Sequence, residues 1–518
     1  MVNATQPART RTAAPAVRAQ AAPKRSFAEA AGGGRRQNFA GIASPNRFTE
    51  AHFAHASRAD AAGNLRPHLQ DLRVRVRYEC DTNAYARGMV ETHANDVVCD
   101  GPSLQMTTPD QAFNAFMEAE FTEWAENYCD AEGQLDLAGI LRVVDAAQLH
   151  TGAILIALQH DAAAETAITL RLKLIEADRL ATPIGMTGDP NVRDGIRFDA
   201  KGRPTHYYIL KRHPGDTSPF GGFGAMDYDT LSARDVIHVF KPDRPGATTA
   251  PPWLTAALLP LADLADYTTS VLRAARRAAG IAGTWETNLD DVETDQDIET
   301  MEPVDMPDDS SLVAPLGWTF KEHKAEQPTA THAAFKADVL AQIGRPVQMP
   351  YNVVAGTSKG SNFASGKLDW GLYFRHVRTV RKTYARAILN RCLREAAADL
   401  RFDKRTRPAW RRLMGDGLTG AWAWPGHDPV DPVKEASAET LNAAGLRDTL
   451  ADAWARRGED WETKLRQIAK EKAFIAALEK EFRVKLDLAD VIPAKTILAS
   501  ALIDEPGGVA ADAGDTAP

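Results

Sequence analysis

Apolar residues recur at helical spacing through two blocks in the first third of the chain. A helix that buries one face carries an apolar residue every three or four positions. That period runs through about 66–100 and again through roughly 109–162, so both blocks predict helix. Gly101-Pro102 ends the first block, because this pair stops a helix. The apolar positions are Ala84, Met89, Val90, Ala94 and Val97 in the first block and Phe113, Phe116, Phe121 and Trp124 in the second.

Between about 166 and 241 the pattern changes to strict alternation. Ile168, Leu170, Leu172 and Leu174 alternate with Thr169, Arg171 and Lys173, which is the period of a half-buried strand. Residues 195–212 predict a hairpin around Lys201-Gly202-Arg203-Pro204, and 236–240 predict a further strand. Helices followed by short strands indicate an α+β domain over about 46–250.

Helical spacing returns after Pro251-Pro252, a position where proline is tolerated in a first turn. One apolar stripe runs to Gly280 and Gly283 and consists of Leu254, Leu258, Leu261, Leu264, Thr268, Val271 and Ala275. Further helices are predicted over about 329–343, 367–400 and 432–482. The Gly-, Ser- and Asn-rich residues 346–366 predict a loop, and 284–326 predict a small irregular or β excursion.

Composition is that of a globular protein with more than one domain. The chain has 518 residues, of which 44% are apolar and 25% charged. It has no run of about 18 uncharged apolar residues, so we expect no transmembrane segment. The basic, Ala- and Pro-rich start lacks the apolar core of a secretory signal, and we expect synthesis in the cytosol. The cysteines, Cys80, Cys99, Cys129 and Cys392, lack metal-ligand spacing and predict free thiols and no metal site.

Charge is strongly segregated along the chain although the net charge is only −8. Residues 345–412 carry 16 Lys and Arg against 4 Asp and Glu, a balance of +12. Residues 286–309 carry 11 Asp and Glu and no Lys or Arg. The first 36 residues hold 7 basic side chains and one acidic. Adjoining segments of opposite sign indicate distinct partners for distinct surfaces.

The pattern G-x-S-x-G at 356–360 matches the nucleophile elbow of serine hydrolases, with Ser358 as nucleophile. No helix is predicted directly after Ser358, and His376 and His427 stand in no recognisable motif, so we do not expect a hydrolase. Residues 360–367 approach a P-loop, but they have one residue too many between the glycines and Leu368 in place of Ser or Thr. The carboxylates of 286–309 lie in a charged run without an apolar pocket to separate their pKa values. We therefore expect no catalytic centre.

Several segments, in order over about 35–480, resemble the lambda-like family of phage portal proteins. The matching residues are Arg77-Tyr78, Asn83, Tyr85-Ala86-Arg87-Gly88 and Ala94-Asn95-Asp96-Val97, then Ile175-Glu176, Asp178-Arg179-Leu180 and Pro183, then Gly195, Asp199, Gly202-Arg203-Pro204 and Tyr208, then His238-Val239-Phe240, Pro242, Arg244-Pro245-Gly246 and Pro252-Trp253-Leu254, and last Asp431-Pro432, Lys434-Glu435, Gly445-Leu446 and Arg457-Gly458-Glu459-Asp460-Trp461. Ala247-Thr248-Thr249 departs from the family's Gln-Arg-Gly-like turn, and the segment after Pro350 is only loosely similar.

The resemblance implies an α+β portal fold with a mixed α/β wing, two stem helices, a small clip, a tunnel loop with a long helix, and a helical C-terminal crown. On this layout the chain divides into a flexible basic arm at 1–45, the wing at 46–250, stem helices at 251–283 and 327–345, the acidic clip at 284–326, the tunnel loop at 346–366, the long basic helix and return to the wing at 367–430, the crown at 431–495 and a disordered tail at 496–518.

The resemblance also implies a non-enzymatic ring, usually of twelve subunits, at one capsid vertex, through which double-stranded DNA is packaged and ejected. Expected partners are further copies of the chain, DNA without sequence specificity, the terminase large subunit, head-tail adaptor proteins, and major capsid and scaffold proteins. No cofactor, metal or membrane is expected, and the location is the virion, with assembly in the host cytoplasm.

Three groups of residues follow as candidate sites. The tunnel loop offers Tyr351, Asn352, Ser358, Lys359, Ser361, Asn362 and Lys367 to DNA. The clip offers Asp290, Asp291, Glu293, Asp295 and Asp297 to the motor and neck proteins. The long helix carries Arg375, Arg378, Arg381, Lys382 and Arg386, which serve either DNA or acidic groups of neighbouring subunits. A DNA-binding structural protein that forms no ring is the alternative, and a serine hydrolase at Ser358 is a more distant one.

Overall fold

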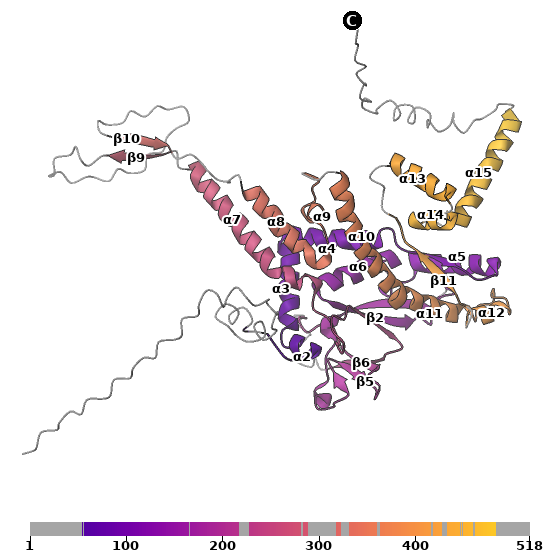
Figure 1. Cartoon of the computed structure of the whole chain (residues 1–518). Helices are drawn as coiled ribbons and strands as arrows, with labels where there is room; N and C mark the ends of the chain where they lie inside the picture. The colour runs from indigo at the N-terminus through magenta and orange to yellow at the C-terminus, as the bar shows by residue number, and fades with distance from the viewer. Residues whose placement is uncertain are drawn as a thin grey trace, which may run out of the picture. The chain divides into compact units, whose positions relative to one another are not determined.

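The computed structural model describes residues 54, 56–164, 166–216, 227–280, 283–287, 318–322, 331–359, 363–415, 418–426, 432–445, 447, 449–458 and 461–482. Contacts divide the chain into Met1–Ala59 and Asp60–Pro518, and every element named below lies in the second unit (Figure 1). These elements mix helices with small antiparallel sheets, so the predicted α+β class is confirmed. The predicted arm at 1–45 and tail at 496–518 lie outside the described residues.

Asn83 divides the first predicted helical block. The block forms α2 (Ala61–Leu65), α3 (Leu69–Thr82) and α4 (Ala84–Val98). The backbone of Asn83 is extended, with φ −108° and ψ 117°, and its side chain accepts a hydrogen bond from the N–H of Tyr85. Asparagine is a favoured N-cap because it satisfies an N–H that the helix leaves free. A single residue therefore ends one helix and begins the next.

The second predicted block forms α5 (Gln111–Asn127), α6 (Leu137–His150) and then a strand, β2 (Ala153–His160). The prediction that helix continues as far as 162 was wrong for the residues of β2. The first six residues of β2 are all buried, and a short continuous apolar run does not distinguish a buried strand from a buried helix. Ile154 and Ile156 join the large helical core, whereas Leu155 joins a second core beneath a small sheet.

The predicted strands between 166 and 241 are confirmed. β2 is the central strand of a three-stranded antiparallel sheet, between β3 (Leu170–Glu176) and β8 (Val236–Phe240). A second antiparallel sheet follows the order β4 (Val192–Arg193), β5 (Ile196–Phe198), β6 (Pro204–Leu210) and β7 (Tyr228–Ser232). The short helices η1 (Ala177–Arg179) and η2 (Ile184–Met186) lie between β3 and β4. The β5–β6 turn contains Gly202 at φ +75°, a conformation that favours glycine.

The apolar stripe after Pro252 forms η3 (Trp253–Ala257) and α7 (Leu258–Gly280), with Leu261 and Leu264 buried. Beyond α7, β9 (Gly283–Thr287) and β10 (Trp318–Glu322) pair antiparallel, in accord with the predicted β excursion. α8 (His332–Gly344) follows and packs against α7. Among the described residues, no helix combines the length and apolar content needed to cross a bilayer.

The segment predicted as a loop over 346–366 is partly helical. It contains the end of η5 (Arg345–Val347), the short helix α9 (Tyr351–Ala355) and the start of α10 (Phe363–Tyr384). Val354 is buried in the helical core, and this burial stabilises α9 against the local preference of a polar segment. The long helix predicted after it is confirmed, since α10 continues through the π-helical turn η6 (Ala385–Leu389) into α11 (Asn390–Leu400).

The C-terminal part begins with α12 (Trp410–Leu413) and β11 (Gly420–Ala423), which pairs antiparallel with β1 (Ser103–Met106). Trp410 is buried against Phe113 and Phe116 of α5, so this linker is packed rather than free. Three helices follow, α13 (Pro432–Ala444), α14 (Leu450–Arg456) and α15 (Trp461–Phe482), as the pattern over 432–482 predicts.

A buried carboxylate joins the long helix to the N-terminal helices. Asp145 of α6 is fully buried and accepts hydrogen bonds from the hydroxyl of Tyr384 at 2.8 Å and from Nδ1 of His93 at 2.6 Å. A buried charge is costly unless its hydrogen bonds are satisfied. Its partners come from α10 and α4, so this group fixes three helices relative to one another.

Arg381 forms a second connection of this kind. Its guanidinium donates to the carbonyls of Val97 and Asp96 in the last turn of α4, at 2.8 and 3.0 Å, and to the carbonyl of Pro425 at 2.9 Å. The same group lies over the ring of Trp424. A cation at a helix C-terminus is favourable because the last carbonyls are unpaired and carry partial negative charge. Arg381, which the sequence offers either to DNA or to neighbouring subunits, is thus engaged within the chain and holds α10 against α4.

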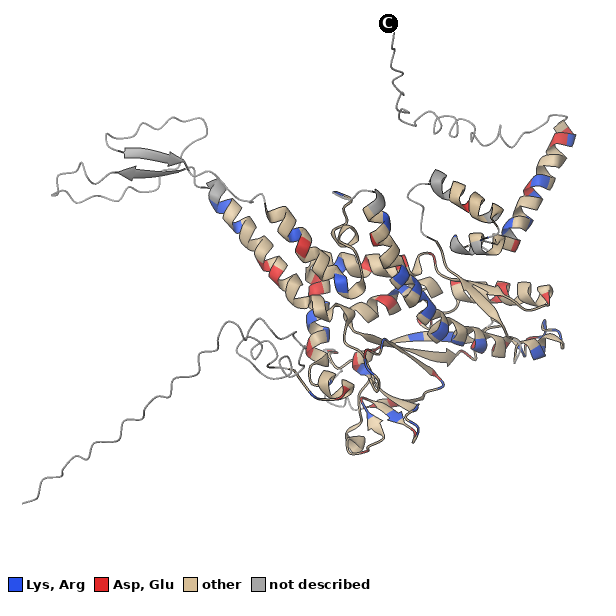
Figure 2. Cartoon of the chain, in the orientation of Figure 1, with Lys and Arg blue, Asp and Glu red and all other residues tan. Residues whose placement is uncertain are grey.

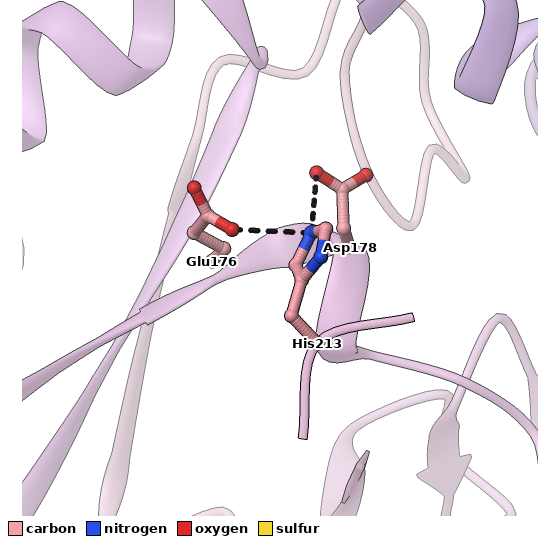
Figure 3. Close-up of side chains that lie close together, drawn as sticks. All are labelled: Glu176, Asp178 and His213. Atoms are coloured by element: carbon pink, nitrogen blue, oxygen red, sulfur yellow. Dashed lines mark ion pairs between the residues drawn. The ribbon is translucent and has the colours of Figure 1, made fainter. Parts of the chain in front are cut away.

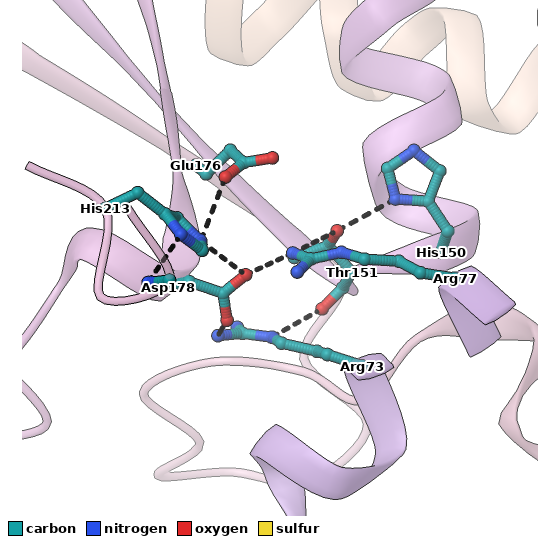
Figure 4. A network of polar contacts seen from close by, with 8 residues as sticks. Arg73, Arg77, His150, Thr151, Glu176, Asp178 and His213 are labelled. Carbon is teal, nitrogen blue, oxygen red and sulfur yellow. Dashed lines mark hydrogen bonds and ion pairs between the residues drawn. The ribbon is translucent and has the colours of Figure 1, made fainter. Parts of the chain in front are cut away.

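An ion-pair network ties α3 to the end of β3 (Figure 4). Asp178, whose side chain is 3% exposed, accepts from Arg73 at 3.0 Å and from Arg77, and Arg73 also donates to the carbonyl of Thr151 at 3.0 Å. Burial alone would raise the pKa of Asp178, but the two guanidinium groups outweigh it and hold that pKa below its usual value. Arg77 and Asp178 belong to the motifs that carry the family resemblance, and the structure gives them this shared role.

We predict that Arg381→Ala lowers the free energy of unfolding by on the order of 2–4 kcal/mol, because three carbonyls lose their donor. The matched control is Arg378→Ala on the exposed side of the same helix, which should change it by less than about 0.5 kcal/mol. Urea unfolding of both variants measures the difference. Equal losses would contradict the structural role of Arg381.

We predict that Asp178→Asn lowers the free energy of unfolding by about 3–5 kcal/mol, because it leaves two guanidinium groups without their carboxylate. Asp189→Asn, which removes a partly exposed pair with Arg197, is the control and should cost less than about 1 kcal/mol. Since the folded-state pKa of Asp178 is lowered, its stabilisation is complete above the unfolded-state pKa of about 3.9 and is lost as pH falls below it. Urea unfolding at neutral and acid pH should show the gap between wild type and variant narrowing with acid. A constant gap would contradict this assignment.

Candidate functional site

Two lysines stand exposed on either side of residues 360–362. Gly356 ends α9 in the left-handed conformation at φ +61°, and Ser358 and Lys359 follow it with exposed side chains. Lys367 is exposed in α10. Tyr351 and Asn352, by contrast, lie in α9 with half-buried side chains, so the structure separates them from the exposed lysines. Ser361 and Asn362 lie outside the described residues.

Four of the five predicted basic residues of the long helix share one exposed stripe. Arg375, Arg378, Lys382 and Arg386 are exposed, and their spacing places them on one side of the helix, whereas Arg381 points to the core. Figure 2 shows this basic segment as blue bands along the helix. Within the described residues, no carboxylate forms an ion pair with any of these four side chains. The stripe is therefore free to meet an external partner.

The predicted clip carboxylates have no structural description. Asp290, Asp291, Glu293, Asp295 and Asp297 all lie outside the described residues, between β9 and β10. Their assignment as a docking surface stays a prediction from the sequence.

Glu176, Asp178 and His213 lie within reach of one cation (Figure 3). Both oxygens of Asp178 already accept from Arg73 and Arg77, and these charges would repel a metal ion. The N–H of Gly215 donates to Nδ1 of His213 at 3.0 Å, so the neutral ring carries its proton on Nε2. In that tautomer Nε2, which lies 3.2 Å from a carboxylate oxygen of Glu176, has no lone pair to offer a cation. The cluster is thus an extension of the ion-pair network and does not fit a metal.

Ser358 does not meet a histidine within the described part of the chain. His376 is buried in α10, where its ring contacts His93 and Trp253 at centroid distances of 5.5 and 5.9 Å. Burial, together with the neighbouring His93, lowers the pKa of His376 to about 4, so the ring is neutral at neutral pH. A serine nucleophile requires a base within hydrogen-bond distance. His427 lies outside the described residues.

The thiols are placed as the sequence predicts. Cys80, Cys129 and Cys392 are buried, Cys99 is half-buried, and all are free. Burial raises the pKa of Cys80 to about 11 and the pKa values of Cys129 and Cys392 to about 12. Since the thiolate is the reactive form, these residues are inert packing groups at neutral pH.

The chain is similar to known portal proteins by sequence. The family profile described as phage portal protein, lambda family, matches residues 49–381. A probable portal protein of Halomonas phage phiHAP-1 is 22% identical over 452 residues, which cover 83% of this chain and 85% of that protein.

Among solved structures, the chain is similar to a chain from the neck of an empty gene transfer agent particle. It is 14% identical, has a TM-score of 0.42, and the match covers 72% of this chain and 89% of that chain. An HK97-family phage portal protein from Corynebacterium diphtheriae is 12% identical with a TM-score of 0.28. That match covers 58% of this chain and 85% of the portal protein's chain.

The profile match spans well over half of the chain, and it includes the α3–α4 helices, the three-stranded and four-stranded sheets, α7, α8 and α10 up to Arg381. All but the last group of motifs identified in the sequence fall within that span, and the last group, at 431–461, lies beyond it. The chain therefore belongs to the lambda family of phage portal proteins, structural components of the phage capsid.

Proposed function

We propose that this chain is the subunit of a closed ring, of twelve copies, at one vertex of the capsid. The ring is the conduit through which double-stranded DNA enters during packaging and leaves during ejection. It also provides the docking site for the terminase motor and for head-tail adaptor proteins, and it nucleates assembly with major capsid and scaffold proteins. Family membership over residues 49–381 supports this role.

The parts of the chain take the following roles in this proposal. The wing comprises 46–250, the stem helices 251–283 and 327–345, the clip 284–326 and the crown 431–495. In this proposal the tunnel loop is a shorter segment than the predicted 346–366, because α9 is packed on the core and α10 begins at Phe363. Residues 356–362, between these helices, are what remains to face the channel.

The exposure of Lys359 and Lys367 is the observation that carries the DNA contact. Both side chains are exposed, one before and one after the polar residues 360–362, and neither has an acidic partner among the described residues. Ammonium groups bind phosphates without reading base sequence, which suits a channel that must pass any DNA. Few contacts per subunit also keep the binding weak and sensitive to salt, so DNA can move.

The variant Lys359→Ala/Lys367→Ala should form rings of normal mass but bind DNA less tightly. Twelve chains of 56.3 kDa give about 0.7 MDa by native mass spectrometry. Each lost phosphate contact should reduce the slope of log affinity against log salt by about 0.9. Lys201→Ala/Lys404→Ala, two exposed lysines elsewhere, should leave the slope unchanged. An unchanged slope in the first variant would remove these lysines from the DNA path, and a monomeric wild type would contradict the ring.

The acidic segment yields a separate test. Replacing Asp290, Asp291, Asp295 and Asp297 with Asn should weaken binding of the motor or neck protein to the ring, because it removes four charges that suit a basic partner. The control replaces the exposed Glu123, Glu126 and Glu132 with Gln. Pull-down of the purified partner at several salt concentrations measures both. Equal binding by both variants would exclude this segment as the docking surface.

A further inference from the structure

The exposed face of α10 is apolar at its start as well as basic. Leu368 is 74% exposed and Leu372 is 53% exposed, and they continue the stripe of Arg375, Arg378 and Lys382 at helical spacing. DNA phosphates account for the basic side chains but not for two leucines in solvent. Leucines bordered by charges are typical of a helix that packs against another helix. The composition of this face indicates a protein partner.

A face of opposite charge occurs on α7 of the same chain. Leu259 is 77% exposed, and the exposed Asp263 and Asp266 follow it with the same spacing of four and then three residues that joins Leu368, Leu372 and Arg375. The other half of α7 reverses sign, with exposed Arg273, Arg276 and Arg277. In Figure 2 the red bands lie along the middle of α7 and the blue bands toward its far end. Only the first half of α7 is complementary to the α10 stripe, and this fixes the register of a contact.

Within one chain, α7 and α10 contact different helices, and neither set of contacts covers the two faces described above. α7 contacts α8, in part through Tyr267 against His332 and Phe335, and also α3, while α10 contacts α4. Both faces are left exposed by these contacts. Two different, complementary surfaces on one molecule produce a head-to-tail contact between copies, and such contacts close into a ring when the rotation per subunit allows it.

We infer that the α10 face of one subunit, formed by Leu368, Leu372, Arg375, Arg378 and Lys382, packs on the α7 face of the next copy, formed by Leu259, Asp263 and Asp266. This inference rests on the proposed ring and names the surfaces that build it. The leucines exclude water from the contact, and the charges select the partner and its register, since exposed ion pairs contribute more to specificity than to affinity. Arg375, Arg378 and Lys382 thereby serve the ring, whereas Lys367 at the start of α10 is left to DNA.

A charge exchange tests the pairing directly. Arg375→Asp/Arg378→Asp should raise the subunit concentration needed for half-assembly by about tenfold or more, because like charges then face each other. Asp263→Arg/Asp266→Arg should do the same. Combining all four substitutions should restore assembly to within about threefold of wild type, because opposite charges meet again. The control combines Arg375→Asp/Arg378→Asp with Glu123→Arg/Glu126→Arg on α5, and it should not assemble better than the α10 variant alone.

Native mass spectrometry measures assembly, and far-ultraviolet circular dichroism confirms that each variant is folded. Normal rings from the α10 variant would overturn the inference, and a loss of DNA affinity in those rings would assign the stripe to DNA. If both single-face variants fail to assemble and the combination does not rescue them, α7 is not the partner, although the ring itself stands. If wild type forms no ring, the proposed function fails first.

Discussion

Strand β2 is covered on both of its faces, and the described fold is arranged around that burial. Ile154, Ile156 and Leu158 contribute to the large core with the helices, while Ala153, Leu155 and Ala157 contribute to the small core with β5 and β6. Successive side chains of a strand point to opposite faces, so an apolar run without alternation requires a layer on each side. The helical layer includes α4, α6 and α10, which brings the long basic helix into contact with the N-terminal half of the chain.

Buried charges then fix how these layers meet. Asp145 joins α6 to α4 and α10, Asp178 joins the end of β3 to α3, and Arg381 joins α10 to the last turn of α4. Each is costly to leave unpaired, so each tolerates one arrangement of its neighbours. The need to pair buried charges also decides which basic residues remain available to bind a partner. Arg381, Arg73 and Arg77 are engaged inside the chain, and the charge that can act on a partner is what remains on the surface.

The sequence predicts most elements of this fold because their apolar periods are long. The strand predicted from the alternation after Ile168 forms as β3 from Leu170 to Glu176. The stripe of α7 and the helix after Lys367 also form where the pattern predicts them. β2 was missed because six consecutive buried residues carry no period, and α9 was missed because tertiary burial of Val354 overrides a loop-like composition. The sequence could identify the basic residues of the long helix as a group, but not which of them are exposed. Sequence spacing gives the angular position of Arg381 relative to Arg378, but which of the two faces the core depends on what packs against the helix.

A channel for DNA and a ring of subunits make opposite demands on basic residues. DNA that must move needs weak contacts that many positions can replace, and two exposed lysines, Lys359 after α9 and Lys367 in α10, suit that demand. A ring under the load of packaged DNA needs contacts fixed in register, and those require apolar area together with paired charges on rigid helices. The exposed leucines on α10 and α7 occur beside charges of opposite sign. In the proposed ring, the exposed bases therefore divide into Lys359 and Lys367, which meet DNA, and the stripe of Arg375, Arg378 and Lys382, which meets the next subunit.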